Sequence, residues 1–179
     1  MSEFVGGALT SQIEAVVQRE TGAGLPTAVL NALRKEFGNP IMDGRVKTLW
    51  PQVHGGLLFR RNMPSDVEEL EAMFGVPFSI VCVNLYPMLD AIASQDATYD
   101  SVITATDVGG KTLLESAGKG GQIAVYDPAD YGRILGALQP DGTVPFQLYL
   151  ELYSKALDML ASYTAAGAHF HSDGRYAKR

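Results

Sequence analysis

The hydrophobic positions of this sequence form two kinds of run, which predict strands and helices in alternation. Continuous apolar runs at 78–86 (FSIVCVNLY) and 122–126 (QIAVY) are typical of strands that are buried on both faces. Residues 88–95 predict a helix or turn, and 98–103 predict a further short strand. Apolar residues at helical spacing predict helices over 10–20, 26–37, 66–74, 111–118, 129–138 and 145–168.

This alternation predicts an α/β fold with a small, mostly parallel sheet. The length of 179 residues favours one domain. Few strands are evident for that length, and the edges of a small sheet have to be covered. We therefore expect a homodimer, since pairing of two copies is a common way to cover an exposed edge or apolar face.

The charge balance narrows the classes of partner. The formal net charge is −6, which argues against non-specific binding to nucleic acid or to anionic membranes. No apolar stretch approaches the roughly 20 residues of a membrane span, and the N-terminus shows no secretory signal. We expect a cytoplasmic protein that acts on a small molecule.

Candidate chemistry lies where the predicted strands end, because ligands of open α/β sheets bind beyond the carboxyl ends of the strands. Asn84 and Tyr86 close the first strand run, and Asp107 stands just before Gly109 and Gly110. Paired glycines let a ligand approach bare backbone N–H groups, and a helix N-terminus adds partial positive charge. This turn is suited to an anion or to a developing oxyanion.

A nucleotide-triphosphate loop is an alternative interpretation of the same turn. Residues 105–112 (ATDVGGKT) satisfy a relaxed form of that motif, with Ala105 in place of the first glycine. Asp107 inside the loop would face the phosphates, and Asp127 is the candidate magnesium ligand. Loss of magnesium-dependent ATP binding on Lys111→Ala would support this alternative.

Four longer runs then point to a family. DGRVKTLWPQVHGGLLFRR, VNLYP, TDVGGKTLLESAGKG and IAVYDPADYGRIL occur in this order, followed by the weaker KALDMLASYTAAGAHF. They resemble the IMP cyclohydrolase domain of the bifunctional purine biosynthesis enzyme. That family typically shows GRVKTLHPxVHGG, VVNLYPF, DIGGxxLLRAAAKN and VVxDPxDY at similar spacing. The resemblance spans residues 40–170 of this chain.

The resemblance implies a fold, an organisation and a reaction. The fold would be a reduced, methylglyoxal-synthase-like three-layer α/β/α arrangement. The chain would divide into a divergent helical segment (1–40), a cyclohydrolase-like domain (41–170) and a frayed tail (171–179). In the family's reaction a carboxamide nitrogen attacks a neighbouring formamide carbon and water leaves, and neither a cofactor nor a metal ion is implied.

Site residues are carried over from the matching motif positions. Lys47 would orient the substrate, Tyr86 would hydrogen-bond or relay a proton, Asp107 would accept a proton, and Lys119 would donate one to the departing oxygen. The implied substrate-binding positions are Arg45, Thr48, Asn84, Gly109, Gly110 and Lys111. Arg45 and Thr48 help hold the phosphate in the family. The backbone of 109–111 would form the oxyanion site.

The first 40 residues depart from the family pattern. The phosphate-gripping runs SVSDKTG and STGG are not found there, Trp50 replaces the family's histidine, and no transformylase domain follows. The leading hypothesis is a stand-alone cyclohydrolase relative in a specialised pathway, whose substrate lacks the ribose phosphate. One alternative is a genuine IMP cyclohydrolase in which Lys111, Arg60 and Arg61, or a partner subunit, replace the phosphate loops. Another is a non-catalytic ligand-binding or regulatory module.

Overall fold

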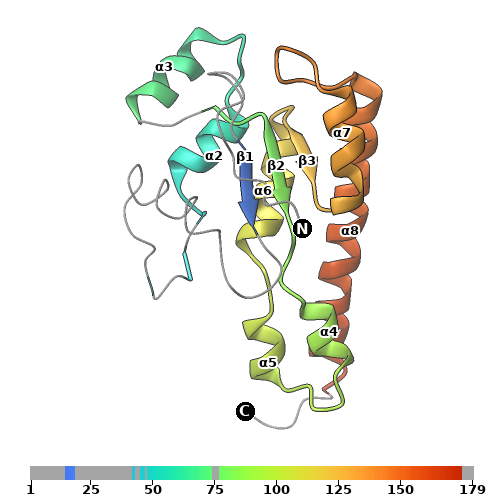
Figure 1. Ribbon diagram of the computed structural model, residues 1–179. Helices are drawn as coiled ribbons and strands as arrows, with labels where there is room; N and C mark the ends of the chain where they lie inside the picture. The colour runs from blue at the N-terminus through green and yellow to red at the C-terminus, as the bar shows by residue number, and fades with distance from the viewer. Residues whose placement is uncertain (1–14, 19–41, 43–44, 47, 74–76, 175–179) are drawn as a thin grey trace.

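A small parallel sheet lies at the centre of the computed structural model, which describes residues 15–18, 42, 45–46, 48–73 and 77–174. Its strands are β1 (Ala15–Gln18), β2 (Ile80–Val83) and β3 (Ile123–Val125), in the order β1-β2-β3. In Figure 1, β2 runs toward α4 (Met88–Ala93) and α5 (Tyr99–Thr104), so these helices mark the carboxyl edge of the sheet. The predicted α/β class with a small parallel sheet is confirmed.

Helices occupy most of the remaining described chain. In addition to α4 and α5, they are α2 (Pro51–Leu58), α3 (Pro64–Ala72), α6 (Gly109–Lys119), the 3-10 helix η1 (Pro128–Asp130), α7 (Tyr131–Ala137) and α8 (Phe146–Ser172). The helices predicted at 66–74, 111–118, 129–138 and 145–168 are confirmed, with ends that shift by a few residues.

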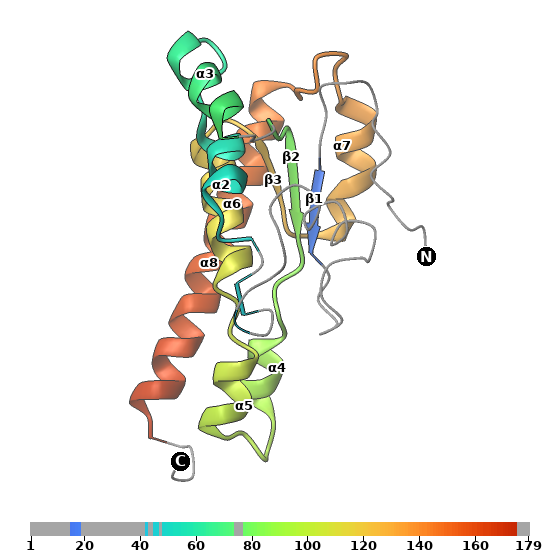
Figure 2. The same ribbon diagram turned by 90° about the vertical axis from the view of Figure 1, so that its left-hand side faces the viewer.

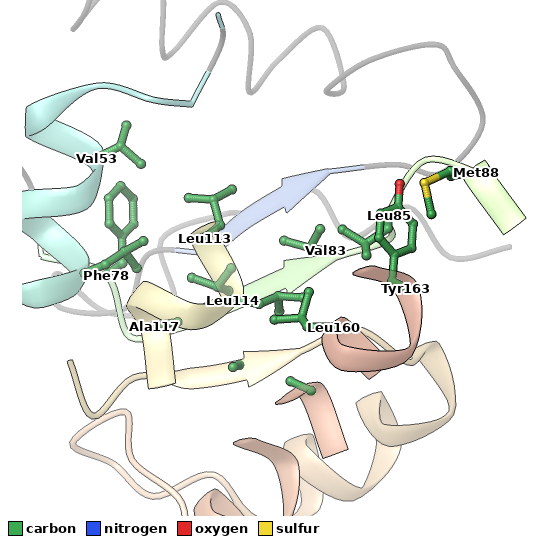
Figure 3. Close-up of a cluster of buried hydrophobic side chains, with 14 of the residues drawn as sticks. Val53, Phe78, Val83, Leu85, Met88, Leu113, Leu114, Ala117, Leu160 and Tyr163 are labelled. Atoms are coloured by element: carbon green, nitrogen blue, oxygen red, sulfur yellow. The ribbon is translucent and has the colours of Figure 1, made fainter. Parts of the chain in front are cut away.

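Helices cover both faces of the sheet, because side chains alternate along β2. Val81 and Val83 join a core formed with α2, α6 and the later part of α8, and Figure 3 shows part of this core. Ile80 and Cys82 pack against a second core, formed with α7 and the first turns of α8. Two apolar faces and two helical layers explain why the run at 78–86 has no polar alternation.

Helix α8 connects the second core to the carboxyl edge. It is 27 residues long, and it contacts β3, α6 and α4. Its buried residues recur every three or four positions, as expected of a helix with one apolar stripe: Leu148, Leu152, Ala156, Leu160, Tyr163, Gly167 and Phe170. The helix extends past the end of the sheet to α4 (Figures 1 and 2), so its later residues lie beside the carboxyl edge.

The helix predicted over 10–20 is wrong at residues 15–18, which form β1. This strand pairs in parallel with β2, with Val16 opposite Val81 and Val17 opposite Cys82. The free edge of β2 offers a row of backbone partners, and two β-branched residues suit a strand. Long-range pairing therefore outweighs the local helical spacing, and one edge of β2 is covered within the chain.

The short strand predicted over 98–103 is also wrong, because α5 occupies this segment. Thr98 Oγ1 accepts a hydrogen bond from Ser101 N at 3.1 Å, and Ser101 Oγ accepts one from Thr98 N at 3.0 Å. This reciprocal pair is a capping box, which stabilises the start of a helix. The signal was present in the sequence as Thr98 and Ser101 at the right spacing.

Helix α8 continues to Ser172, so the first two residues of the predicted frayed tail (171–179) are helical. The helix predicted over 26–37 and the residue Lys47 lie outside the described residues. Within the described part of the chain, no helix has the length and apolar character that crossing a membrane requires.

Candidate active site at the carboxyl edge of the sheet

Asp107 is the buried polar centre of the carboxyl edge, with 2% of its surface exposed. Its Oδ1 accepts a hydrogen bond of 2.6 Å from the backbone N–H of Gly110, in the first turn of α6. Its Oδ2 accepts one of 3.4 Å from the backbone N–H of Tyr86, in the loop that follows β2. The carboxylate therefore joins the helix start to the strand end, which are the two places that the sequence singled out.

The two glycines of this turn allow a close approach that a side chain would prevent. A Cβ atom at Gly110 would lie 2.7 Å from Asp107 Oδ2 and 2.8 Å from Val83 Cγ1. A Cβ atom at Gly109 would lie 2.7 Å from Thr48 Oγ1. The absence of Cβ atoms thus lets the helix start pack against Thr48, which is 4% exposed.

Tyr163, which the sequence analysis did not single out, completes this cluster from α8. Its hydroxyl oxygen accepts a 2.9 Å hydrogen bond from Asp107 N, and it lies 3.2 Å from Ala105 O and 3.4 Å from Tyr86 O. Figure 3 shows its ring beside Leu85 and Met88. The signal was a tyrosine inside the weaker run KALDMLASYTAAGAHF.

The surroundings of Tyr163 keep its hydroxyl protonated. Burial raises its pKa above the ordinary value of 10.0, and the negative charge of Asp107 acts in the same direction. The hydrogen bond from the Asp107 N–H opposes both effects, but the pKa stays raised. Lys111 Nζ lies 5.7 Å from the centre of the Tyr163 ring, so a positive charge stands over the ring at the start of α6.

The predicted residues of the RVKT run are only partly described. Thr48 belongs to the cluster, whereas Arg45 is exposed and Lys47 is outside the described residues. Trp50, which replaces the family's histidine, is half-buried and packs against the larger core.

Asn84 also lies at the carboxyl edge, but on the other face of the sheet. Val83 and Leu85 belong to the core that contains Tyr163, so the residue between them faces the α7 side. The Oδ1 of Asn84 accepts a 3.4 Å hydrogen bond from the hydroxyl of Tyr131, which begins α7. The structure therefore does not bring the Asn84 side chain together with Asp107.

The chain is similar to known proteins in sequence and in fold. No protein-family model matches the chain. The bifunctional purine biosynthesis protein PurH of Lactobacillus delbrueckii is 38% identical over 170 residues, which cover 90% of this chain. PurH of Lactiplantibacillus plantarum is 36% identical over 175 residues and 95% of this chain. A solved structure, titled as the crystal structure of ForH, matches 78% of this chain and 74% of its own, with 30% identity and a TM-score of 0.63.

The chain belongs to the family of the PurH cyclohydrolase region. It spans about a third of the length of these PurH proteins, with 33% and 34% covered. Because the second match covers 95% of this chain, the similarity also extends into residues 1–40, where β1 lies.

The PurH-family position Lys119 lies at the opposite edge of the sheet. It ends α6, while Gly109 begins it, and ten residue steps of helix separate their Cα atoms by about 15 Å along the axis. Helix α6 connects parallel strands, so it runs back from the carboxyl edge to the amino edge, as Figure 1 shows. Lys119 is exposed there, and the described structure does not bring it together with Asp107.

Arg60 and Arg61, the proposed substitutes for the phosphate loops, also lie away from the cluster. Arg61 Nη2 donates to Phe78 O at 2.9 Å and to Ser79 Oγ and Gln122 Oε1 at 3.2 Å each, at the starts of β2 and β3. Arg60 forms a bidentate pair with Asp66. Both guanidinium groups are bound by acceptors of the chain near the amino edge.

The nucleotide-triphosphate alternative loses two of its elements. The backbone N–H of Gly110, which a phosphate loop would offer to its ligand, donates to Asp107 instead. Asp127 accepts a 2.6 Å hydrogen bond from Lys155 Nζ, which also binds Asp130 at 2.7 Å. Lys155 lowers the pKa of Asp127 below its ordinary value. Among the described residues, no group of three or more metal-binding side chains comes together.

Proposed function

We propose that this protein is a cyclohydrolase-like enzyme, which closes a ring on an amide-bearing small molecule with loss of water, or which hydrolyses such a ring. The observation that supports this most directly is the buried Asp107, held between the first turn of α6 and the loop after β2. This cluster lies at the carboxyl edge, where α/β folds bind their ligands, and it uses the family's NLYP and DxGG positions.

In the proposed closure, the carboxamide nitrogen attacks the formamide carbon and forms the new N–C bond. The formyl oxygen becomes negatively charged in the tetrahedral state and then leaves as water. One proton of that water comes from the carboxamide nitrogen and the other from the formamide nitrogen, which ends in a C=N bond. The reaction therefore needs donors for the oxyanion and a base near the attacking nitrogen.

The described residues fit these roles as follows. Backbone N–H groups of Gly109 and Lys111 belong to the first turn of α6, where the helix dipole favours negative charge. Within the described part of the chain, the Lys111 ammonium makes no salt bridge, so it can attract an anionic group of the substrate. Asp107 is the proposed base, and the Tyr86 side chain the proposed proton relay.

The leading proposal and its main alternative differ in the substrate: a compound without the ribose phosphate in the first, and the nucleotide precursor of IMP in the second. The phosphate-gripping runs of the family are not found in the sequence of residues 1–40, and Arg60 and Arg61 are bound by the chain's own acceptors. Both facts favour a substrate without the ribose phosphate. The similarity to PurH over 90% of the chain favours IMP formation instead.

An absorbance assay tests both substrates together. The formylated aminoimidazole carboxamide ribonucleotide and the corresponding nucleoside are offered in parallel, and ring closure is followed in the ultraviolet. Closure of the nucleoside alone supports the leading proposal, and closure of the nucleotide supports a genuine IMP cyclohydrolase. Tight binding of either compound with no turnover would support a non-catalytic ligand-binding module.

The Asp107→Asn variant tests the placement of the site. Asparagine keeps an acceptor for Gly110 N but removes the base, so turnover should fall by about 100-fold or more. Lys119→Ala, at the amino edge, is expected to change turnover less than about threefold, the size of a small surface effect. Equal losses in both variants, measured with folding checked by circular dichroism, would contradict a site confined to the carboxyl edge.

We also retain the homodimer as a proposal, which rests on the sequence argument that a small sheet needs its edges covered. The strand β1 covers one edge of β2 within the chain. Light scattering at micromolar concentration checks this proposal directly, and a monomeric mass would contradict it.

A further inference from the structure

The hydroxyl of Tyr163 lies within hydrogen-bond distance of three backbone groups, which belong to two loops of the candidate site. It accepts a hydrogen bond from Asp107 N at 2.9 Å. Its single hydrogen points to one of two carbonyl oxygens, that of Ala105 at 3.2 Å or that of Tyr86 at 3.4 Å. The residue is 3% exposed, so no solvent molecule can readily replace these hydrogen bonds.

The position of this hydroxyl is set by α8 and not by the loops that it holds. The Tyr163 ring packs in the larger core with Leu85 and Met88 (Figure 3), and α8 packs against α4 and α6. Helices with many buried contacts hold a side chain more rigidly than loops do. The loops 84–87 and 105–108 therefore take their relative position from a fixed atom outside both of them.

A single hydrogen bond connects this hydroxyl to Asp107, the proposed base of the reaction. The backbone N–H of Asp107 donates to this hydroxyl, and the carboxylate of Asp107 accepts hydrogen bonds from Gly110 N and Tyr86 N. A shift of Asp107 would move the proposed base and the first turn of α6 together. Misplacement of reacting groups by about 1 Å can reduce a rate by as much as 100-fold.

We propose that Tyr163 is a positioning residue of the active site, which fixes Asp107 and the first turn of α6 relative to the Tyr86 loop. This inference rests on the proposed function. Tyr163 acts through Asp107, because its hydroxyl accepts the Asp107 N–H and has its own hydrogen directed to a backbone carbonyl oxygen of the two loops.

Tyr163→Phe tests this role, because it keeps the packed ring and removes only the hydroxyl. The matched control is Tyr153→Phe on the same helix. Tyr153 packs against α6, since a Cβ at Gly118 would lie 2.0 Å from its ring, and the described residues show no hydrogen bond from its hydroxyl. The two variants differ in the hydrogen bonds that they remove, while both keep an aromatic ring on α8.

Turnover is the first readout, with whichever substrate the wild-type enzyme accepts. In Tyr163→Phe we expect kcat to fall by about 10- to 100-fold while KM changes little, and in Tyr153→Phe neither should change. The double variant Tyr163→Phe, Asp107→Asn should be no slower than Asp107→Asn alone, because both changes disable the same group. An unchanged kcat in folded Tyr163→Phe, or fully multiplicative losses, would overturn the proposal.

Amide hydrogen exchange is the second readout and needs no turnover. Exchange over the peptide that contains 105–110 should become faster in Tyr163→Phe and stay at the wild-type rate in Tyr153→Phe, since Asp107 N loses its acceptor only in the first. Unchanged exchange in this peptide would overturn the positioning role. Absence of turnover in the wild-type protein would instead refute the proposed function, so the two failures are distinguishable.

Discussion

The two edges of this sheet are both rich in polar side chains, but they use them differently. At the carboxyl edge a buried carboxylate, Asp107, binds backbone N–H groups, and Lys111 stands nearby over an aromatic ring. At the amino edge Arg61 and Gln122 are bound by each other and by carbonyl groups, and they tie the strand starts together. Among the described residues, Lys111 at the carboxyl edge makes no salt bridge. At the amino edge, the side chains of Arg61 and Gln122 hydrogen-bond to groups of the chain itself.

This difference separates motif positions that the sequence presents as one set. Asp107 and Lys119 belong to one continuous run, yet they lie at opposite ends of α6. Residues that are neighbours in a sequence motif can therefore lie far apart, because a helix of 11 residues carries its two ends to opposite edges of the sheet. The three predictions below test the contrast between the edges, from the largest expected effect to the smallest.

The largest effect is expected from Gly120→Ala at the amino edge. A Cβ atom there would lie 1.8 Å from the carbonyl oxygen of Leu57, a backbone atom that has no rotamer to escape into. We expect the free energy of unfolding to fall by about 3 kcal/mol or more, measured by urea denaturation. The control is Gly132→Ala in α7, where nothing lies within 4 Å and alanine favours the helix. Wild-type stability in Gly120→Ala would show that α2 and α6 do not approach so closely.

A smaller effect is expected from Arg61→Ala. Three acceptors at the strand starts would lose their donor, so stability should fall by about 1–2 kcal/mol. Arg60→Ala, which breaks only an exposed pair with Asp66, should be less destabilising. Turnover of the folded fraction should stay unchanged in both. If Arg61→Ala removed activity toward a phosphorylated substrate only, the amino edge would regain a role in phosphate binding.

The smallest effect on stability is expected from His54, which lies between the two edges. Its Nδ1 lies 3.0 Å from Ser116 Oγ, and this hydrogen bond links α2 to α6. Burial lowers its pKa below 6.5, and a backbone group of Thr48 only partly offsets this. Between the folded and unfolded pKa values the unfolded state binds more protons, so stability falls as the pH drops below 6.5. Well above pH 6.5 His54 is neutral in both the folded and the unfolded state, so its titration costs no stability there.

His54→Gln should remove this part of the pH dependence. We expect the wild type to lose up to about 1 kcal/mol more than the variant between pH 8 and pH 5.5, measured by denaturation at each pH. At pH 8 histidine is neutral in both states, so the comparison there reports only the change in packing. Parallel pH profiles for the two proteins would show that His54 does not contribute.

Some elements could be predicted from the sequence because their signals are local. The run at 78–86 predicts β2 since nine residues without polar alternation fit a strand that is buried on both faces. Two glycines after Asp107 predict a turn that opens a helix, and α6 begins there. Helix α8 follows from its repeated apolar spacing over many turns.

Other features depended on partners that are distant in sequence. β1 is a strand because β2 offers it an edge, and no periodicity in 10–20 records that partner. Tyr163 lies 56 positions after Asp107, and only the course of α8 beside the carboxyl edge brings its hydroxyl to the Asp107 N–H. The separation of Lys119 from Asp107 could have been predicted from the sequence, because a helix of 11 residues between parallel strands must run from one edge of the sheet to the other.

The sequence by itself determined the α/β class, the strand β2, the turn at Asp107 and the family, because each of these is recorded in neighbouring residues. The tertiary structure alone decided which motif residues share a site. It joined Thr48, Asp107 and Tyr163 at one edge and left Asn84 on the other face and Lys119 at the other end. The physical reason is that side-chain proximity depends on strand direction, sheet face and helix length, which act on the whole chain at once.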